Sequence, residues 1–174
     1  PLLTCVYQPT RNSGDVTLNA ARGLAESLGA AFHVFDVDPI VAAYIALAED
    51  ALGRPLTWER DDLALQNIQA RARGPSVWML ANLKNALLLA TSNRSEASVG
   101  YATMDGDTCG GISPLGGINK AWLLSWLRWL QTKPAPTAPL DLAPVPALAA
   151  VTAQAPTAEL RPAGAAQTDE GDLM

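Results

Sequence analysis

The sequence predicts an α/β protein with a parallel sheet that is covered by helices on both faces. Short apolar and β-branched segments at residues 2–9, 31–39 and 85–93 have the character of buried strands. Between them lie segments of helical character, which are long enough to cross over the sheet and start the next parallel strand. With 174 residues, the chain can bury about 70% of the surface that it exposes when unfolded, so one hydrophobic core is possible.

Capping and stop residues mark the ends of the first two predicted helices. The helix over residues 13–29 has Ser13 or Asp15 as its N-cap and Gly29 as its stop, and the next helix stops at Gly53. Both glycines follow runs with good helix propensity. These signals predict where the chain turns back toward the sheet.

Two later helices carry unusual residues. The helix over residues 61–73 is expected to break at Gly74 and Pro75 and to resume over residues 76–84, because a proline inside a helix removes a hydrogen bond at a cost of about 3 kcal/mol. The helix over residues 118–131 is strongly apolar, and its aromatic residues favour a core or a subunit interface over a cofactor platform. Those residues, at helical spacing, are Trp122, Trp126 and Trp129.

Composition excludes two classes of partner. The net charge of −5 argues against a broad nucleic-acid surface, which needs an excess of Lys and Arg. No apolar run approaches the roughly 20 residues that cross a bilayer, and the first residues lack the basic region of a signal peptide, so we expect a soluble, cytoplasmic protein. Cys5 and Cys109 show no metal or disulfide spacing, and His33 in an alternating strand segment is expected to be structural.

The most distinctive polar cluster is TSNRSEASVGYATMDGD, residues 91–107, which directly follows an apolar strand segment. Ligands of open parallel sheets bind outside the carboxyl ends of the strands, and this places Thr91 and Glu96 at a candidate site. A purely structural interpretation is that Ser92 or Asn93 caps the next helix, with Glu96 in its first turn.

A second acid, Asp107, lies eleven residues beyond Glu96 in a loop whose glycines permit a close approach of the backbone to a ligand. Two carboxylates that face one cleft suit Mg²⁺. Lys120 begins the tryptophan-rich helix, where a cation costs about 0.3–1 kcal/mol unless an anion binds there. The alternative for Lys120 is an exposed side chain that reaches into water.

Four segments together resemble a known family. They are NIQARAR (67–73), the long segment from Ala90 to Trp122, APTAELRP (155–162) and QTDEGDLM (167–174). They are similar to the synthetase domain of NAD synthetases, particularly the glutamine-hydrolysing kind, over nearly the whole chain. The resemblance implies the Rossmann-like fold of the ATP-pyrophosphatase (PP-loop) group, also described as adenine nucleotide alpha-hydrolase-like.

The resemblance also implies a reaction. Members of the family use ATP and Mg²⁺ to adenylate the nicotinate carboxylate of deamido-NAD (nicotinic acid adenine dinucleotide), and ammonia then displaces AMP to give NAD. The acyl-adenylate has a good leaving group, so no protein nucleophile is needed. The positions that the resemblance assigns are Glu96 and Asp107 for the metal, Thr91, Lys120 and Thr157 for ATP, Asn67 and Arg71 for deamido-NAD, and Lys120 with Asp107 for catalysis.

The same resemblance divides the chain. It implies a partial synthetase domain over residues 1–131, a Pro/Ala-rich mobile loop over residues 132–156 that serves as a lid, and a truncated C-terminal part over residues 157–174. The S-G-G-x-D-S loop of the family does not occur in this sequence. We therefore expect a fragment that lacks the first βα unit and is inactive alone, from a homo-oligomeric parent enzyme whose amidase domain supplies ammonia from glutamine.

Two other functions stay open at this point. The chain as given is either a non-catalytic nucleotide-binding fragment or a relative of a different PP-loop amidotransferase, such as a GMP synthetase. Binding of Mg-ATP and deamido-NAD by this chain tests the first, and the choice between deamido-NAD and XMP as substrate of the parent enzyme tests the second.

Overall fold

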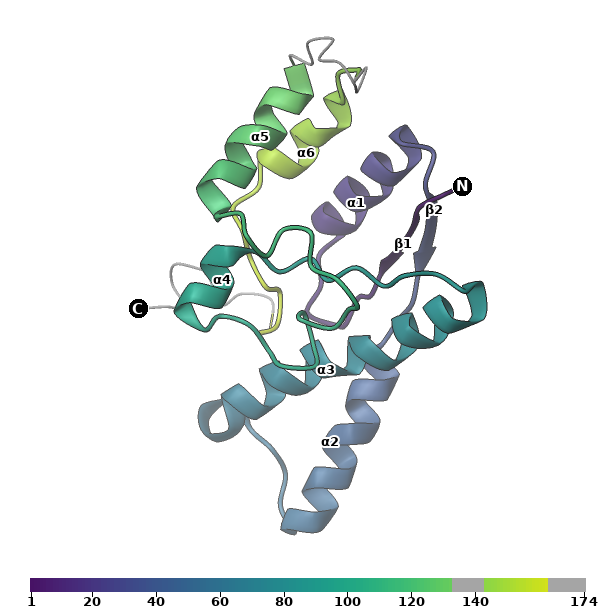
Figure 1. Ribbon diagram of the computed structural model, residues 1–174. Coiled ribbons are helices and arrows are strands. Elements are labelled where there is room, and N and C mark those ends of the chain that lie inside the picture. Colours follow the sequence, from purple (N-terminus) through teal and green to yellow (C-terminus); the bar gives the residue numbers. More distant parts are fainter. Residues whose placement is uncertain (133–142, 163–174) are drawn as a thin grey trace.

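The computed structural model describes residues 1–132 and 143–162, and Figure 1 shows how its elements are arranged. Strand β1 (Thr4–Tyr7) pairs in parallel with β2 (Ala31–Val34). Helix α1 (Asp15–Ser27) connects the two strands and packs against both of them. The predicted α/β class and the parallel sheet are therefore confirmed, whereas the missing first βα unit stays a prediction.

Glycines end the first two helices as expected. Gly29 follows α1 with φ 65°, and Gly53 caps the next helix with φ 63°, a region that glycine adopts without a clash of a Cβ atom. The N-cap expectation for α1 is wrong, because the N-cap residue is Gly14. The hydroxyl of Ser13 accepts a hydrogen bond from Thr10 N at 3.1 Å and so closes the preceding turn instead.

Helices α2 (Asp38–Leu52) and α3 (Trp58–Lys84) pack against each other in the lower half of Figure 1. Pro39 lies in the first turn of α2, where a proline leaves no hydrogen bond unmade. The non-helical backbone within α3 lies at Asp61, near its start. Asp61 pairs with Arg54 at 2.9 Å and so fixes the connection between the two helices.

The expected break of α3 at Gly74 and Pro75 is wrong, because the helix continues through both residues. Tertiary hydrogen bonds hold this turn of the helix. Gln8, just after β1, donates from Nε2 to Arg73 O at 2.8 Å and to Ser76 Oγ at 2.7 Å. Arg73 Nε donates to Gln8 O at 3.0 Å in return. Contacts from the residue that follows β1 thus stabilise a helical turn that the local sequence disfavours.

The predicted third strand, over residues 85–93, is reduced to a single bridge in the described part of the chain. Leu89 pairs in parallel with Ile112, and Ala90 N donates to Ile112 O at 2.9 Å. Leu89 is 42% exposed, so this segment is less buried than its apolar composition suggests. It nevertheless leads the chain directly into the polar residues 91–107.

Helix α5 (Lys120–Thr132) carries its tryptophans at the surface. No residue of this helix is buried, and Trp122 and Trp126 are 72% and 48% exposed. The interpretation that they belong to the core is therefore wrong. The alternative, a subunit interface, stays a prediction.

Two short helical elements lie within residues 143–156, a described part of the Pro/Ala-rich stretch. The 3-10 turn η1 (Pro146–Leu148) and the short helix α6 (Ala149–Thr152) pack against α1 and α5, and Leu148 is buried. The rest of the predicted lid and the segment QTDEGDLM lie outside the described residues. No helix in the described ranges combines the length and the apolar character that crossing a membrane requires.

Candidate functional site

A cavity of about 550 Å³ lies between α3, the polar residues 91–107 and the segment 156–160. Its wall brings together side chains from parts of the chain that are far apart in sequence. A concave site with a few convergent polar groups is the usual form of a small-molecule site. The predicted residues that line it are Asn67, Thr91, Glu96, Asp107, Lys120 and Thr157.

Helix α4 (Arg94–Val99) positions Glu96 through a capping box. Asn93 Oδ1 accepts a hydrogen bond from Glu96 N at 3.1 Å, and Glu96 Oε2 accepts one from Asn93 N at 3.1 Å. The predicted cap is confirmed at Asn93. Because the same carboxylate lines the cavity, the capping role and the binding role of Glu96 are compatible.

Lys120, in the first turn of α5, is paired with this carboxylate. Its Nζ lies 3.4 Å from Glu96 Oε1, and the two side chains are 29% and 23% exposed, so the alternative of a lysine that reaches into water is wrong. Lys120 N donates to Ser95 Oγ at 3.0 Å, which ties α5 to α4. The carboxylate offsets the unfavourable position of a cation at a helix N-terminus and keeps the ammonium at the cavity.

Asp107 supplies the second carboxylate of the cavity wall. Burial of its carboxyl group raises the pKa of Asp107, and the nearby charge of Glu96 raises it further, although the hydrogen bond from Thr103 N to Oδ1 at 2.7 Å opposes both effects. The charge of Glu96 disfavours the ionised form of Asp107, and a cation bound beside both carboxylates would offset this repulsion.

Asp107→Asn is expected to increase the free energy of unfolding of the ligand-free chain at neutral pH. A pKa that is raised in the folded state means that the stabilising form is the protonated one, which is fully present below the unfolded pKa and is lost as the pH rises through the folded pKa. Asparagine does not ionise, and its Oδ1 still accepts the hydrogen bond from Thr103 N. Denaturation at a series of pH values should therefore show an advantage of the variant that grows toward neutral pH. An advantage that is independent of pH would contradict the raised pKa.

Two glycines allow the loop around Asp107 to pack closely. A Cβ atom at Gly106 would lie 3.0 Å from the backbone of Ala70 in α3, and one at Gly110 would lie 2.5 Å from Ala90 N. These glycines therefore permit a close approach to protein backbone, and the expected approach to a ligand stays a prediction. Their packing holds the loop against both α3 and the segment that precedes Thr91.

Helix α3 presents Asn67 to the cavity, but not Arg71. The residues of α3 that line the cavity form a stripe along one face of the helix, centred near Ala70. Asn67 lies at one edge of this stripe, and Arg71 lies outside it, next to Asn67. Arg71 is exposed, and its Nε donates to Met104 O at 3.1 Å. Asn67 Oδ1 accepts from Thr103 Oγ1 at 3.0 Å. Both residues thus hold the loop that carries Asp107. The stripe consists of Leu63, Gln66, Asn67, Ala70 and Arg73.

Arg73 lines the cavity and was not among the predicted site residues. Burial lowers its pKa, while the nearby Tyr7, Glu159 and Asp107 raise it. A guanidinium stays protonated at physiological pH, so the wall contains a half-buried cation. The residues of α3 that line the cavity follow the spacing i, i+3, i+4, i+7 and i+10, counted from Leu63. This helical spacing points to Arg73 once the side of the helix that faces the cavity is known.

The family model described as NAD synthase matches residues 3–174, which is nearly the whole chain. The chain belongs to the NAD synthase family. The resemblance seen in the sequence is thereby confirmed, and the cavity lies in a domain of this family.

Curated relatives of the NAD synthase family are similar over the same range. The glutamine-dependent NAD(+) synthetase of Xylella fastidiosa (strain 9a5c) is 34% identical over 171 residues, which are 98% of this chain and 29% of that protein. The glutamine-dependent NAD(+) synthetase of Rhodobacter capsulatus is 35% identical over 172 residues, 97% of this chain and 29% of that protein. The chain thus spans less than a third of the length of these relatives.

Solved NAD synthetases share the fold. The glutamine-dependent NAD(+) synthetase of Cytophaga hutchinsonii superposes with a TM-score of 0.73 at 58% identity, over 75% of this chain and 23% of that chain. That of Acinetobacter baumannii, solved in complex with adenosine diphosphate, gives a TM-score of 0.69 at 26% identity, over 87% of this chain and 26% of that chain.

The donor set of the cavity fits one hard cation. The described residues contain no group of three or more His, Cys, Asp and Glu side chains that would hold a metal by themselves. Mg²⁺, however, takes only one or two protein carboxylates together with substrate oxygens and water, and Glu96 with Asp107 matches that set. The carboxylate of Glu96 has roughly four lone pairs that can accept hydrogen bonds. Three of them accept hydrogen bonds from Asn93 N, Asn93 Nδ2 and Lys120 Nζ, which leaves one lone pair for a cation.

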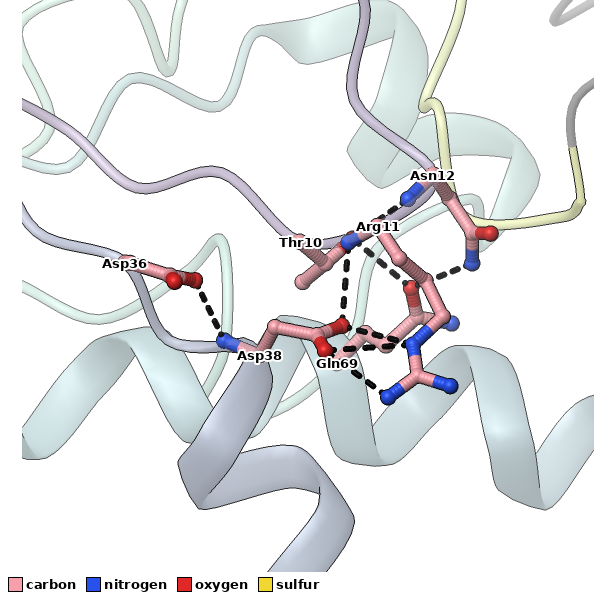
Figure 2. A network of polar contacts seen from close by, with 6 residues as sticks. All are labelled: Thr10, Arg11, Asn12, Asp36, Asp38 and Gln69. Atoms are coloured by element: carbon pink, nitrogen blue, oxygen red, sulfur yellow. Dashed lines mark hydrogen bonds and ion pairs between the residues drawn. The ribbon is translucent and has the colours of Figure 1, made fainter.

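A smaller cavity of about 250 Å³ lies beside Gln69, and Figure 2 shows the polar network at its edge. Arg11 binds Asp38 with an N–O distance of 2.8 Å and holds the pKa of that carboxyl below its usual range. Gln69 Oε1 accepts from Thr10 Oγ1 at 3.2 Å and from Asn12 Nδ2 at 2.9 Å. These contacts fasten the loop after β1 to α2 and α3, and we interpret the network as structural.

Proposed function

We propose that the larger cavity is the site at which deamido-NAD is amidated to NAD in an ATP-dependent reaction that proceeds through an acyl-adenylate and releases AMP and pyrophosphate. The observation that carries the proposal is that every predicted substrate or metal position except Arg71 lies in one cavity wall. The membership of the NAD synthase family supports it, as does the adenosine diphosphate bound to the Acinetobacter baumannii relative.

The charges of the wall suit the first step. When the nicotinate carboxylate attacks the α-phosphate, two anions come together, so cations must neutralise the charge that develops in the transition state. Lys120 and Arg73 are the cationic side chains that the structure describes in this wall. The hydroxyls of Thr91 and Thr157 are donors for phosphate oxygens.

A bound Mg²⁺ would be held by Glu96 and Asp107 and would supply Lewis-acid neutralisation of the triphosphate. Asn67 would contact deamido-NAD directly, whereas Arg71 would act by holding the neighbouring loop through Met104 O. In the second step ammonia displaces AMP, and the wall needs no nucleophile for that step. Cys109, a free thiol, therefore has no role in the proposed reaction.

We further propose that the parent enzyme takes its ammonia from glutamine through an amidase domain, and that it acts in the cytoplasm as a homo-oligomer. The relatives are described as glutamine-dependent, and this supports the ammonia source. The exposed Trp122 and Trp126 of α5 support an apolar contact in the assembly.

The function is tested by the substrate choice of the parent enzyme and by binding to this chain. We expect the parent to form AMP and pyrophosphate from ATP with deamido-NAD and not with XMP, and we expect this chain alone to bind Mg-ATP without turnover. Formation of AMP with XMP instead would identify a GMP synthetase relative. A parent that binds Mg-ATP but forms AMP with neither substrate would favour a non-catalytic nucleotide-binding protein. Turnover by this chain alone would show that the S-G-G-x-D-S loop is not needed.

A further inference from the structure

We propose that Glu159 is a positioning residue, which holds residues 156–161, here called the strap, in the shape that closes one wall of the cavity at Thr157. The proposal rests on the proposed function of the cavity as an ATP site. Pro156, Thr157, Ala158 and Leu160 line the cavity, whereas Glu159 reaches from the strap to the start of α1.

The carboxylate of Glu159 is bound by a hydroxyl relay. Thr17 Oγ1 lies 3.0 Å from Glu159 Oε2 and 3.2 Å from Oε1. Tyr7 Oη lies 2.7 Å from Thr17 Oγ1, and a donation from Tyr7 leaves the Thr17 proton for the carboxylate. Thr17 Oγ1 is also 2.9 Å from Gly14 O, but a carboxylate is the stronger acceptor. Residues of β1 and α1 thus anchor the strap.

The position of this carboxylate also suits the helix that it meets. Gly14, the N-cap of α1, has no side chain that could cap the helix. Glu159 Oε1 lies 3.3 Å from the place that a Cβ atom of Gly14 would occupy. A negative charge is favourable at a helix N-terminus, so the carboxylate of Glu159 stabilises the start of α1 through its charge.

The backbone of Glu159 sets the orientation of Thr157. Glu159 has φ 49°, a left-handed conformation that non-glycine residues rarely adopt and that its surroundings must hold in place. In this conformation Glu159 N donates to Thr157 Oγ1 at 3.3 Å. Because the hydroxyl oxygen accepts this bond, its proton is left as a donor for a phosphate oxygen in the cavity.

The other end of the strap is fastened separately. Gln69 Nε2 donates to Leu160 O at 2.6 Å, and Arg161 binds Asp62 at 2.8 Å. These contacts hold the C-terminal half of the strap to α3, whereas Glu159 holds the half that contains Thr157. Loss of the Glu159 side chain should therefore release Thr157 without detaching the whole strap.

The test combines ATP affinity with hydrogen–deuterium exchange of residues 156–161 in this chain. We expect Glu159→Ala to weaken Mg-ATP binding about tenfold, the usual effect of losing a hydrogen bond to a charged group, and to speed exchange in the strap. Thr17→Val removes the hydroxyl that binds Glu159 and should also weaken Mg-ATP binding. Thr17→Ser keeps that hydroxyl and should retain the affinity of the unmodified chain. Glu26→Ala, which removes an exposed acid from the same helix, is the matched control.

The choice of ligand separates positioning from a general loss of structure. Glu159→Ala should weaken Mg-ATP binding while it leaves the affinity for deamido-NAD unchanged, and a defect that is equal for both ligands would overturn the proposal. An ATP affinity of Glu159→Ala equal to that of the unmodified chain would also overturn the proposal. If the unmodified chain binds no ATP, the proposed function fails, and the exchange rates alone then decide: faster exchange in Glu159→Ala supports the anchor, and unchanged exchange refutes it.

Discussion

Glu96→Gln is expected to weaken magnesium-dependent ATP binding by about 10- to 100-fold while the fold remains intact. Glutamine at this position of the first turn of α4 maintains a capping box with Asn93, because its Oε1 accepts the same backbone hydrogen bond. The negative charge that faces Asp107 and Lys120 is lost, and an interaction with a charged group contributes about 1.5–3 kcal/mol. Calorimetry with ATP in the presence and absence of Mg²⁺, together with thermal unfolding, measures both effects.

Glu96→Ala is the matched comparison for this prediction. It removes the charge and the capping box together, so we expect the same loss of ATP affinity and an additional loss of about 1 kcal/mol in the free energy of unfolding. The difference between the two variants isolates the capping contribution. ATP affinity of Glu96→Gln equal to that of the unmodified chain would remove Glu96 from the proposed metal site.

Gly110→Ala is expected to destabilise the fold by about 1–3 kcal/mol, because the new methyl group would overlap with the backbone of Ala90. Its Cβ atom would lie 2.5 Å from Ala90 N and 3.1 Å from Ala90 Cα. The neighbouring bridge between Leu89 and Ile112 fixes the distance between these two segments. Because Thr91 directly follows Ala90, we also expect weaker ATP binding in any folded fraction. Chemical denaturation followed by calorimetry tests both effects.

Gly23→Ala is the control for the glycine substitution. Gly23 lies on the exposed side of α1, and a Cβ atom there would meet nothing within 4 Å. Alanine should therefore stabilise α1 by about 0.5–1 kcal/mol, through the lower entropy of its unfolded state. A loss of stability of Gly110→Ala no larger than 0.5 kcal/mol would mean that the loop around Asp107 adjusts freely, contrary to the packing described above.

Signals that act within a few residues were readable from the sequence alone. The stops at Gly29 and Gly53 depend on a positive φ that glycine adopts most easily, and the cap at Asn93 depends on a side chain that reaches its own helix. The α/β class follows from strand and helix segments in alternation. The resemblance to NAD synthetases in turn indicated that Thr91 and Thr157, far apart along the chain, would share one site.

Three features of the structure depend on contacts between residues that are distant in sequence, and only the tertiary structure determined them. Helix α3 continues through Pro75, where Gln8 binds the adjacent turn, and Arg73 rather than Arg71 faces the cavity because the lining face of α3 is centred near Ala70. The pairing of Lys120 with Glu96 required α4 and α5 to be in contact. Local signals determine an element end where a residue acts on its own backbone, as at Gly53 and Asn93, whereas the continuity of α3 and the faces that helices present depend on packing against elements that sequence spacing does not specify.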